Sequence, residues 1–512
     1  MEMPSSVFVM TSLQFLSTLF IVTIGFSALA VVILFILDIT QIGDAVRRNY
    51  PVIGRFRYLF SKLGEFFRQY FFAMDREEMP FNRAEREWIY KSAQGYDNTL
   101  AFGSTKSLNL PGTTIFVNYP FPTLDQDAVE MQPLQIGPYC PQPYLAPSFF
   151  NISGMSYGAL STPAVRALSN GARLAGCWLN TGEGGLSPYH LEGGCDIVMQ
   201  IGTAKYGVRD SKGRLCDSKL KEVAAHQQVR MFELKMSQGA KPGKGGILPA
   251  VKVTSEIARI RGIPEGEDSI SPNRHPEINS PDEMLDMIKH IREVTGKPVG
   301  FKAVFGSFGW LETLCRKIHQ RGIEAAPDFV TVDSGDGGTG AAPMPLMDNV
   351  GLVVKESLPL VSDILSQYGL RERIRLIASG KLVTPSEVAW AIASGADFVV
   401  SARGFMFSLG CIQALKCNKN TCPIGITTHN KRLQKGLNPK NKAVKVANFC
   451  KNIIHDVQVI SHSCGVKRAR LMRREHVRIV QSNGKSIPMD KLYPYPDILP
   501  EYQNIANTGV KS

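Results

Sequence analysis

The chain has 512 residues, of which 44% are hydrophobic, and its net charge is +13. This composition excludes an intrinsically disordered protein and suits one large domain or two to three ordinary ones. The positive charge could indicate nucleic-acid binding, but no nucleic-acid motif and no basic run with interleaved aromatic residues is present. We therefore expect no nucleic-acid partner, and a basic surface that is partly solvated and partly attracted to an anionic membrane.

The N-terminal stretch at 7–37 contains no charged side chain. A membrane-spanning helix needs about 20 apolar residues, whereas the apolar core of a signal peptide has about 7–15 and follows a basic region. No basic residue precedes this stretch, and it is too long and too uniformly apolar for a buried core helix. We therefore predict a transmembrane segment at 1–40 that makes the chain a single-pass membrane protein.

A basic juxtamembrane region follows at 41–110. Its arginines and lysines place the C-terminal side of the span in the cytoplasm by the positive-inside rule. The ten scattered cysteines agree with this, because they favour a reducing compartment over a disulfide scaffold. Residues 52–74 mix aromatic and basic side chains, which suits an amphipathic helix on the membrane interface or one packed on the soluble domain.

Short apolar runs alternate with helical periodicities from about residue 110 onward. The clearest apolar runs lie at 231–237, 298–304, 328–335, 374–380 and 397–403. Continuous apolar runs are typical of parallel strands that are buried on both faces. Polar or glycine residues follow every run, as in a (β/α)8 barrel, whereas a doubly wound sheet concentrates its signal in one glycine-rich turn. We predict an α/β fold with a (β/α)8 TIM barrel over 111–480 and a tail at 481–512.

Glycine-rich loops recur at 151–161, 179–186 and 333–343, and again after the last two predicted strands. Such loops let backbone N–H groups approach an anion, and barrels commonly bind a phosphate after strands seven and eight. Their number indicates a large phosphate-bearing ligand over the barrel mouth. Lys302 interrupts an apolar run, so it either serves a function there or reaches solvent at the strand end.

Three cysteines, Cys411, Cys417 and Cys422, lie close together late in the chain. Their odd number and the reducing compartment argue against disulfides. Structural zinc normally takes four ligands, and His429 is the nearest candidate for a fourth. The three cysteines could also be unrelated thiols of the core. However, Pro423 follows Cys422, and a proline after the last ligand is recurrent in iron–sulfur proteins. The spacing alone indicates a soft-metal site.

Six stretches between about residues 145 and 430 together resemble the flavin-binding synthase domain of glutamate synthase, and they occur in the order found in that family. They are "ISGMSYGALS", "GARLAG", "NTGEGG", "FELKMSQGAKPGKGG", "SGDGGTGAAP" and "CIQALKCNKNTCPIGI". The resemblance implies a barrel that binds FMN and a [3Fe-4S] cluster. The implied cluster ligands are Cys411, Cys417 and Cys422.

The chemistry implied by the resemblance makes L-glutamate from 2-oxoglutarate and ammonia. The two condense to 2-iminoglutarate, and hydride from N5 of reduced FMN then reaches the imine carbon. The implied catalytic residues are Glu183, Gln238, Lys241 and Arg261. The residues expected to contact FMN are Ser153, Gly154, Met155, Ser156, Asn180, Lys302, Asp336, Gly337, Gly338, Gly340, Ser379, Gly380, Arg403 and Gly404.

The chain departs from the family pattern in the substrate loop, where Lys244 replaces an acid and Ile247 replaces a glutamine. There is also no room for an N-terminal glutaminase domain, so we expect ammonia from solution or from a separate glutaminase. No second dinucleotide-binding domain is visible, which favours a ferredoxin or a membrane-bound electron donor. Two alternatives follow: an enzyme forming another amino acid such as N-methylglutamate, or a membrane-tethered electron-transfer subunit.

Overall fold

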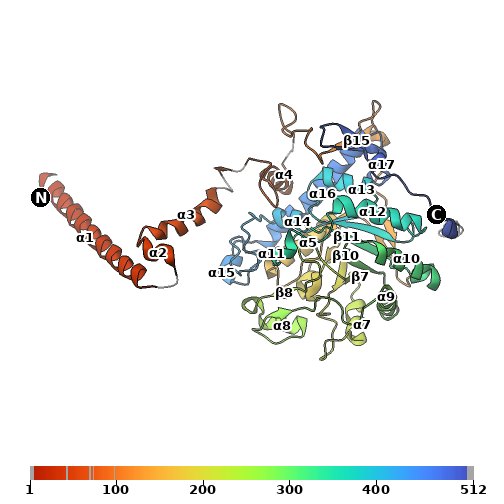
Figure 1. Cartoon of the computed structure of the whole chain (residues 1–512), viewed down its shortest axis with the longest axis horizontal. Helices are drawn as coiled ribbons and strands as arrows, with labels where there is room; N and C mark the ends of the chain where they lie inside the picture. The colour runs from red at the N-terminus through yellow and green to blue at the C-terminus, as the bar shows by residue number, and fades with distance from the viewer. Residues whose placement is uncertain (1–4, 42–43, 68–70, 73, 97–98, 504–512) are drawn as a thin grey trace. The chain divides into compact units, whose positions relative to one another are not determined.

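The computed structural model divides the chain into two compact units, Met1–Ala84 and Glu85–Ser512. The residues that it describes are 5–41, 44–67, 71–72, 74–96 and 99–503. The cartoon in Figure 1 follows both units along the chain.

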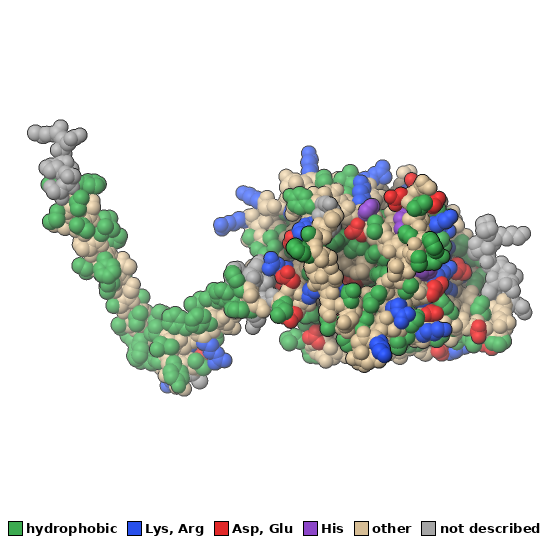
Figure 2. Space-filling model, turned by 90° about the horizontal axis from the view of Figure 1, so that it is seen from above, with side chains coloured by type: hydrophobic (Ala, Val, Ile, Leu, Met, Phe, Trp, Pro, Cys, Tyr) green, Lys and Arg blue, Asp and Glu red, His purple; other side chains and the backbone are tan. Residues whose placement is uncertain are grey.

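The first unit consists of three helices, α1 (Ser5–Thr40), α2 (Ala45–Asn49) and α3 (Gly54–Phe67). Over Val7–Thr40, α1 is long and apolar enough to cross a membrane. Figure 2 shows hydrophobic side chains along this helix, with backbone and other uncharged side chains between them. A helix therefore forms where the sequence predicts a span, and its length and composition suit that role.

A buried carboxylate ties these three helices together. Asp38, near the end of α1, is fully buried and lies 2.7 Å from the guanidinium nitrogens of both Arg47 and Arg55. The Val52 amide also donates to Asp38, at 3.0 Å. The helix α3 occupies part of the predicted amphipathic stretch and exposes large apolar side chains, while residues 68–70 and 73 of that stretch lie outside the described residues.

The second unit is built around a closed barrel of eight parallel strands, so the predicted (β/α)8 fold is confirmed. Each apolar run singled out in the sequence forms one of these strands. In chain order the barrel strands are β4 (Phe150–Ile152), β5 (Leu179–Asn180), β6 (Ile197–Ile201), β7 (Val229–Lys235), β10 (Val299–Val304), β11 (Phe329–Asp333), β12 (Arg375–Ser379) and β13 (Phe398–Ser401).

Helices follow the strands and form the outer layer of the barrel, as in Figure 1. They are α5 (Thr162–Ala175), α6 (Pro188–Leu191), α7 (Asp217–Ala225), α9 (Pro281–Thr295), α10 (Gly309–Arg321), α12 (Val354–Gln367), α13 (Pro385–Ala393), α14 (Arg403–Ser408) and α16 (Pro439–Ser463). The largest departure from strand–helix alternation follows β7. There the chain makes a long excursion that contains β8 (Ile247–Leu248), α8 (Ser255–Arg261) and β9 (Ser269–Ile270).

The two ends of the barrel differ in character. A hairpin of β2 (Leu134–Ile136) and β3 (Tyr144–Ala146) packs into the apolar core at the N-terminal ends of the strands. At the C-terminal ends, the parallel register brings polar residues of neighbouring strands together. Lys235 of β7 pairs with Lys302 of β10, and Asp333 of β11 pairs with Ser379 of β12. The C-terminal rim therefore brings polar side chains from neighbouring strands together, as at the active-site end of such barrels.

Segments before and after the barrel also pack on it. The helix α4 (Arg83–Gln94) lies against α16, where the Trp88 and Phe449 rings meet edge to face. The strand β1 (Thr114–Phe116) forms a small sheet with β14 (Val477–Val480) and β15 (Ser486–Pro488).

The basic stretch at 467–478 is only partly exposed to solvent. Arg474 is only 1% exposed and is paired with Asp363. Arg470 lies over the Phe398 ring, 4.8 Å from its centroid. These two arginines hold the C-terminal segment on the barrel, because a buried cation has to be paired or to contact an aromatic face.

Candidate active site

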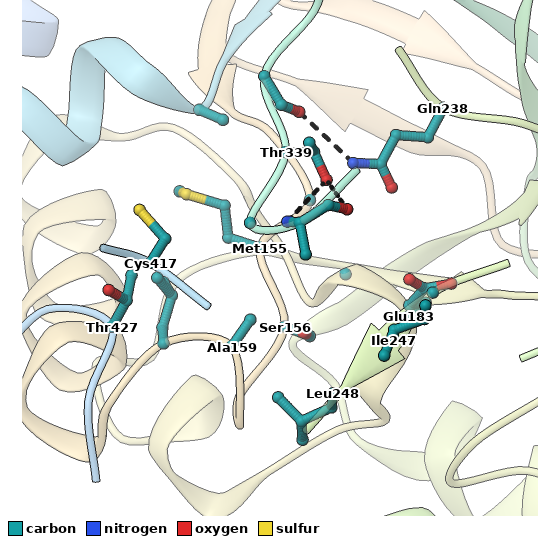
Figure 3. Close-up of a pocket in the computed structure, with 18 of the residues that line it drawn as sticks. Met155, Ser156, Ala159, Glu183, Gln238, Ile247, Leu248, Thr339, Cys417 and Thr427 are labelled. Carbon is teal, nitrogen blue, oxygen red and sulfur yellow. Dashed lines mark hydrogen bonds between the residues drawn. The ribbon is translucent and has the colours of Figure 1, made fainter. Parts of the chain in front are cut away.

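A cavity of about 1030 Å³ opens at the C-terminal ends of the barrel strands. Its walls come from the loops after β4, β5, β11 and β13 and from the excursion after β7. Figure 3 shows Cys417 and Thr427 on one side of it and Glu183 and Ile247 on the other. The predicted site residues that line it are Gly154, Met155, Ser156, Glu183, Gln238, Lys241, Arg261, Lys302, Gly338, Gly340, Arg403 and Cys417.

Buried positive charge dominates this cavity. Five cations that line it are each less than 8% exposed, and Glu183 is the one carboxylate among the described lining residues. The five are Lys235, Lys241, Lys252, Arg261 and Lys302. Burying unpaired charge is costly, so an excess of four cations is stable only with anions or water nearby. The site is therefore built for anionic ligands.

Glu183 is held in its ionised form. Burial works to raise its pKa, but the neighbouring Lys235, Lys241 and Arg261 outweigh burial and bring the pKa to about 2. Its carboxylate lies 3.1 Å from the Lys235 ammonium. Gly246 leaves room for this carboxylate, since a Cβ at that position would lie 2.3 Å from one of its oxygens. At neutral pH this group accepts hydrogen bonds and cannot donate a proton.

Lys235 connects Glu183 to the glycine-rich loop after β11. Its ammonium donates to Gln238 Oε1 at 2.6 Å, and Gln238 Nε2 donates to the Gly338 carbonyl at 3.4 Å (Figure 3). Burial lowers the pKa of Lys235 to about 8, against the opposing effect of Glu183. The adjacent charge of Lys302 lowers it further. Lys235 can therefore gain or lose a proton close to neutral pH.

Two of the lysines are left for a ligand. The ammonium groups of Lys241 and Lys302 have no hydrogen-bond or ion-pair partner among the described residues, although both side chains are buried. Lys302 also faces a smaller cavity of about 250 Å³ inside the barrel, which Ser153 and Asn180 line. The expectation that Lys302 serves a function agrees with its burial better than a head group in solvent.

Arg261 is more constrained than the sequence suggests. Its two terminal nitrogens donate to Ser269 Oγ at 3.1 Å and to the Tyr157 carbonyl at 3.3 Å. The guanidinium also lies over the Tyr206 ring. Its Nε atom is buried and has no partner among the described residues, so one donor remains for a ligand. We assign Arg261 mainly to fixing the walls of the cavity.

Lys252 is a cavity residue that the sequence analysis did not identify. It is 2% exposed, and its ammonium donates to the carbonyls of Ala159 at 2.9 Å and Cys417 at 3.2 Å. It thereby joins the loop after β4 to the cysteine loop, residues 410–425. The available signal was a lysine within the apolar stretch "LPAVKV".

Several predicted contact residues instead form the framework behind the cavity. Asp336 pairs with Lys381 at 3.0 Å and accepts a hydrogen bond from Ser334. Ser379 Oγ donates to Asp333 at 2.8 Å. The predicted residues absent from the described cavity lining are Ser153, Asn180, Asp336, Gly337, Ser379, Gly380, Gly404, Cys411 and Cys422. Ser153 and Asn180 line the smaller cavity below.

The cysteine loop carries three free thiols, of which Cys417 lines the cavity. Among the described residues, no three His, Cys, Asp or Glu side chains are close enough to hold a metal ion. The backbone of the loop is unusual, because Gln413, Leu415 and Asn420 all adopt left-handed φ values of 53° to 58°. Non-glycine residues rarely adopt this conformation, and it is concentrated at ligand sites.

Three comparisons with known proteins bear on this geometry. A family model described as a conserved region in glutamate synthase matches residues 124–467. The glutamate synthase large subunit-like protein YerD of Bacillus subtilis (strain 168) is 39% identical, over 92% of this chain and 97% of its own length. The archaeal glutamate synthase (NADPH) of Methanocaldococcus jannaschii is 34% identical, over 66% of this chain and 63% of its own length. Among solved structures, a flavocytochrome b2 variant gives a TM-score of 0.45 at 13% identity and covers 84% of each chain, which carries no argument about function.

The cavity should bind a small dicarboxylate more weakly at pH 9 than at pH 7. Burial lowers the pKa of both Lys235 and Lys252 to about 8, so both are mostly protonated at pH 7 and mostly neutral at pH 9. Loss of one binding charge raises Kd about tenfold over this interval. Calorimetric titration with glutarate measures the change, and its uncharged dimethyl ester is the control. Equal glutarate affinity at the two pH values would contradict the assignment.

Proposed function

Because the chain belongs to the glutamate synthase family of oxidoreductases, we propose that it converts 2-oxoglutarate and ammonia to L-glutamate. The reaction consumes 2-oxoglutarate, ammonium, two electrons and two protons, and it releases glutamate and water. FMN and a [3Fe-4S] cluster are the proposed cofactors. The excess of buried cations over carboxylates in the cavity is the observation that carries this proposal. A dicarboxylate substrate and a phosphate-bearing cofactor are the anions that such a site would bind.

FMN fits the described cavity by charge and by backbone access. Gly154, Gly338 and Gly340 line the cavity, and the Cβ position of Gly340 faces open space where a flat ring can approach. Arg403 lies against the loop after β11, where its Nη2 donates to the Thr339 carbonyl at 2.5 Å. We assign Lys302 and Arg403 as the cations for this cofactor. When bound, FMN would supply hydride to the substrate carbon.

The cysteine loop fits an iron–sulfur cluster by its donor set. Three thiols are available within 12 residues, and burial works to raise the pKa of Cys422. The backbone N–H groups of Ile424, Ile426 and Thr427 outweigh burial and lower that pKa, because they donate toward the sulfur. Hydrogen bonds to sulfur are a general means of tuning such clusters. We assign Cys411, Cys417 and Cys422 as the ligands of a cluster that would supply electrons one at a time.

The side chains of the cavity would bind the charged substrates and supply the proton that the reaction needs. Lys241 is free to bind a substrate carboxylate. Glu183 stays ionised and would accept N–H bonds from ammonium or from a protonated imine. The Lys235 ammonium lies against Glu183 and can release its proton near neutral pH, so it is the proposed proton donor to the departing water. Gln238 keeps Lys235 in place.

We further propose that α1 crosses the membrane once and that the barrel faces the cytoplasm. The length and composition of α1 and the arginines that follow it support this topology. The electron donor would be a ferredoxin or a membrane-bound carrier. Ammonia would come from solution or from a separate glutaminase.

A second candidate product is an N-alkylated amino acid such as N-methylglutamate. Ile247 and Leu248 line the cavity, and Ile247 lies beside Glu183 in Figure 3. An apolar wall next to the proposed amine site would contact a methyl group favourably. We predict measurable 2-oxoglutarate consumption by the reduced enzyme with ammonia, with methylamine, or with both. A higher kcat/KM for methylamine selects the second candidate, and no consumption with either amine rejects both.

Lys241→Ala should abolish glutamate formation while FMN stays bound. The change removes a cation that has no other partner among the described residues, and turnover should fall about a hundredfold or more. Lys221→Ala is the matched control, because Lys221 is exposed on α7 and does not line the cavity. Flavin absorbance measures cofactor content, and glutamate formation measures turnover. Normal turnover in Lys241→Ala would contradict its role. A parent protein with no turnover at all would favour the electron-transfer subunit.

Cys417→Ser should remove the cluster but retain the flavin. The expected result after anaerobic purification in detergent is loss of iron and of the three-iron paramagnetic resonance signal, with flavin absorbance unchanged. Cys216→Ser is the control, because Cys216 is also half-exposed but lies before α7, away from the cysteine loop. An iron content equal to that of the parent would contradict the assignment, and so would a parent protein without colour.

A further inference from the structure

The cysteine loop lies within the longest segment of the chain that contains no acidic residue. No acidic residue lies between Asp397 and Asp456. The cations in this interval are Arg403, Lys416, Lys419, Lys431, Arg432, Lys435, Lys440, Lys442, Lys445 and Lys451. The catalytic proposal uses Arg403 alone among them, so the others call for a separate explanation.

Five of these cations form an exposed patch, here called the basic rim, which consists of Lys416, Lys419, Lys431, Arg432 and Lys435. All five are exposed, and none makes an ion pair with another described residue. Leu415 is 71% exposed and precedes Lys416 directly. An exposed leucine beside unpaired lysines is the pattern of a surface that inserts an apolar tip among anions.

Hydrogen bonds hold the parts of the basic rim together. Thr428 Oγ1 donates to the Asn420 carbonyl at 2.6 Å, and Gln434 Nε2 donates to the Thr428 carbonyl at 2.8 Å. These bonds join the cysteine loop to the short helix α15 (Lys431–Gln434). Two of the five cations, Lys431 and Arg432, lie on this helix, and Lys435 follows it directly. The rim is therefore one structured surface beside Cys417 and Cys422.

The chain enters this unit beside the same loop. Tyr90 of α4 donates its hydroxyl proton to the Cys411 carbonyl at 2.5 Å. Asn448 and Asn452 of α16 donate to carbonyls at the end of α4, at 3.2 Å and 2.9 Å. In Figure 1, α4, α14, α15 and α16 lie on the same side of the barrel unit. The polypeptide that follows α1 therefore arrives close to the cysteine loop.

From these observations we propose that the basic rim and Leu415 dock on an anionic lipid bilayer. The inference rests on the proposed membrane anchoring by α1. A tether keeps the bilayer at a high effective concentration, and exposed lysines are drawn to anionic headgroups. A soluble acidic protein would also match the charge, but it would explain neither the exposed leucine nor the nearby entry of the tether. The electron donor would then be a carrier held in the membrane, because lipid covers the surface nearest the cysteines.

Tryptophan quenching by brominated lipids tests the docking. The full-length Leu415→Trp protein is placed in nanodiscs that contain brominated phosphatidylcholine, with or without phosphatidylglycerol. We expect at least a twofold greater quenching, relative to the parent protein in the same discs, when phosphatidylglycerol is present. High salt should reverse the gain, because it screens exposed charges. Adding Lys416→Glu and Lys419→Glu to the same chain should abolish it.

Leu145→Trp is the matched control, since Leu145 is 61% exposed on the hairpin at the other end of the barrel. Its indole should not be quenched by either lipid mixture. If the protein stays in the discs, equal quenching at positions 145 and 415, or no quenching at position 415, overturns the docking proposal. If the protein does not stay in the discs, both the anchoring by α1 and the docking of the basic rim are overturned. Unchanged lipid contact but slower reduction by a soluble acidic redox protein in the double-glutamate variant would assign the rim to that protein.

Discussion

The excess of buried positive charge at the barrel mouth is the constraint on which the rest of the site depends. Five buried cations and one carboxylate line a cavity that the barrel forms at the ends of its parallel strands. The register makes Lys235 and Lys302 direct neighbours on β7 and β10, so their repulsion has to be offset locally. Glu183 offsets part of it, and anionic ligands would offset the remainder.

That constraint also explains the glycine-rich loops. Glycines let the backbone approach closely enough to carry the charged groups into a narrow space, as at Gly246 against Glu183. Gly380 has a φ of +123°, and a Cβ there would lie 2.1 Å from the Ser334 side chain. These positions serve the packing of one loop on another. A glycine-rich sequence therefore marks the neighbourhood of a ligand more reliably than it marks the atoms that touch it.

The sequence predicts the barrel and its charged rim well, because apolar strand runs and a lysine within such a run are local signals. Lys302 was identifiable for this reason. Lys252 also lies in an apolar stretch, but its role depends on carbonyl groups 93 and 165 residues away in the chain, which no local pattern shows. Asp336 illustrates the opposite case, since it pairs with Lys381 and is absent from the described cavity lining. Arg474 and Asp363, 111 residues apart, likewise make a basic stretch part of the core.

Lys252 also links the part of the cavity that would bind substrate to the cysteine loop that would receive electrons. Its single ammonium binds the Ala159 carbonyl on the substrate side and the Cys417 carbonyl on the cysteine side. A shift of the cysteine loop would break one of two hydrogen bonds to a buried charge, which is costly in a dry environment. The loop that would receive electrons is therefore fixed to the wall of the cavity that would use them. In the proposed reaction, electron entry and substrate binding would then depend on the same buried cation, rather than on two sites that can move independently.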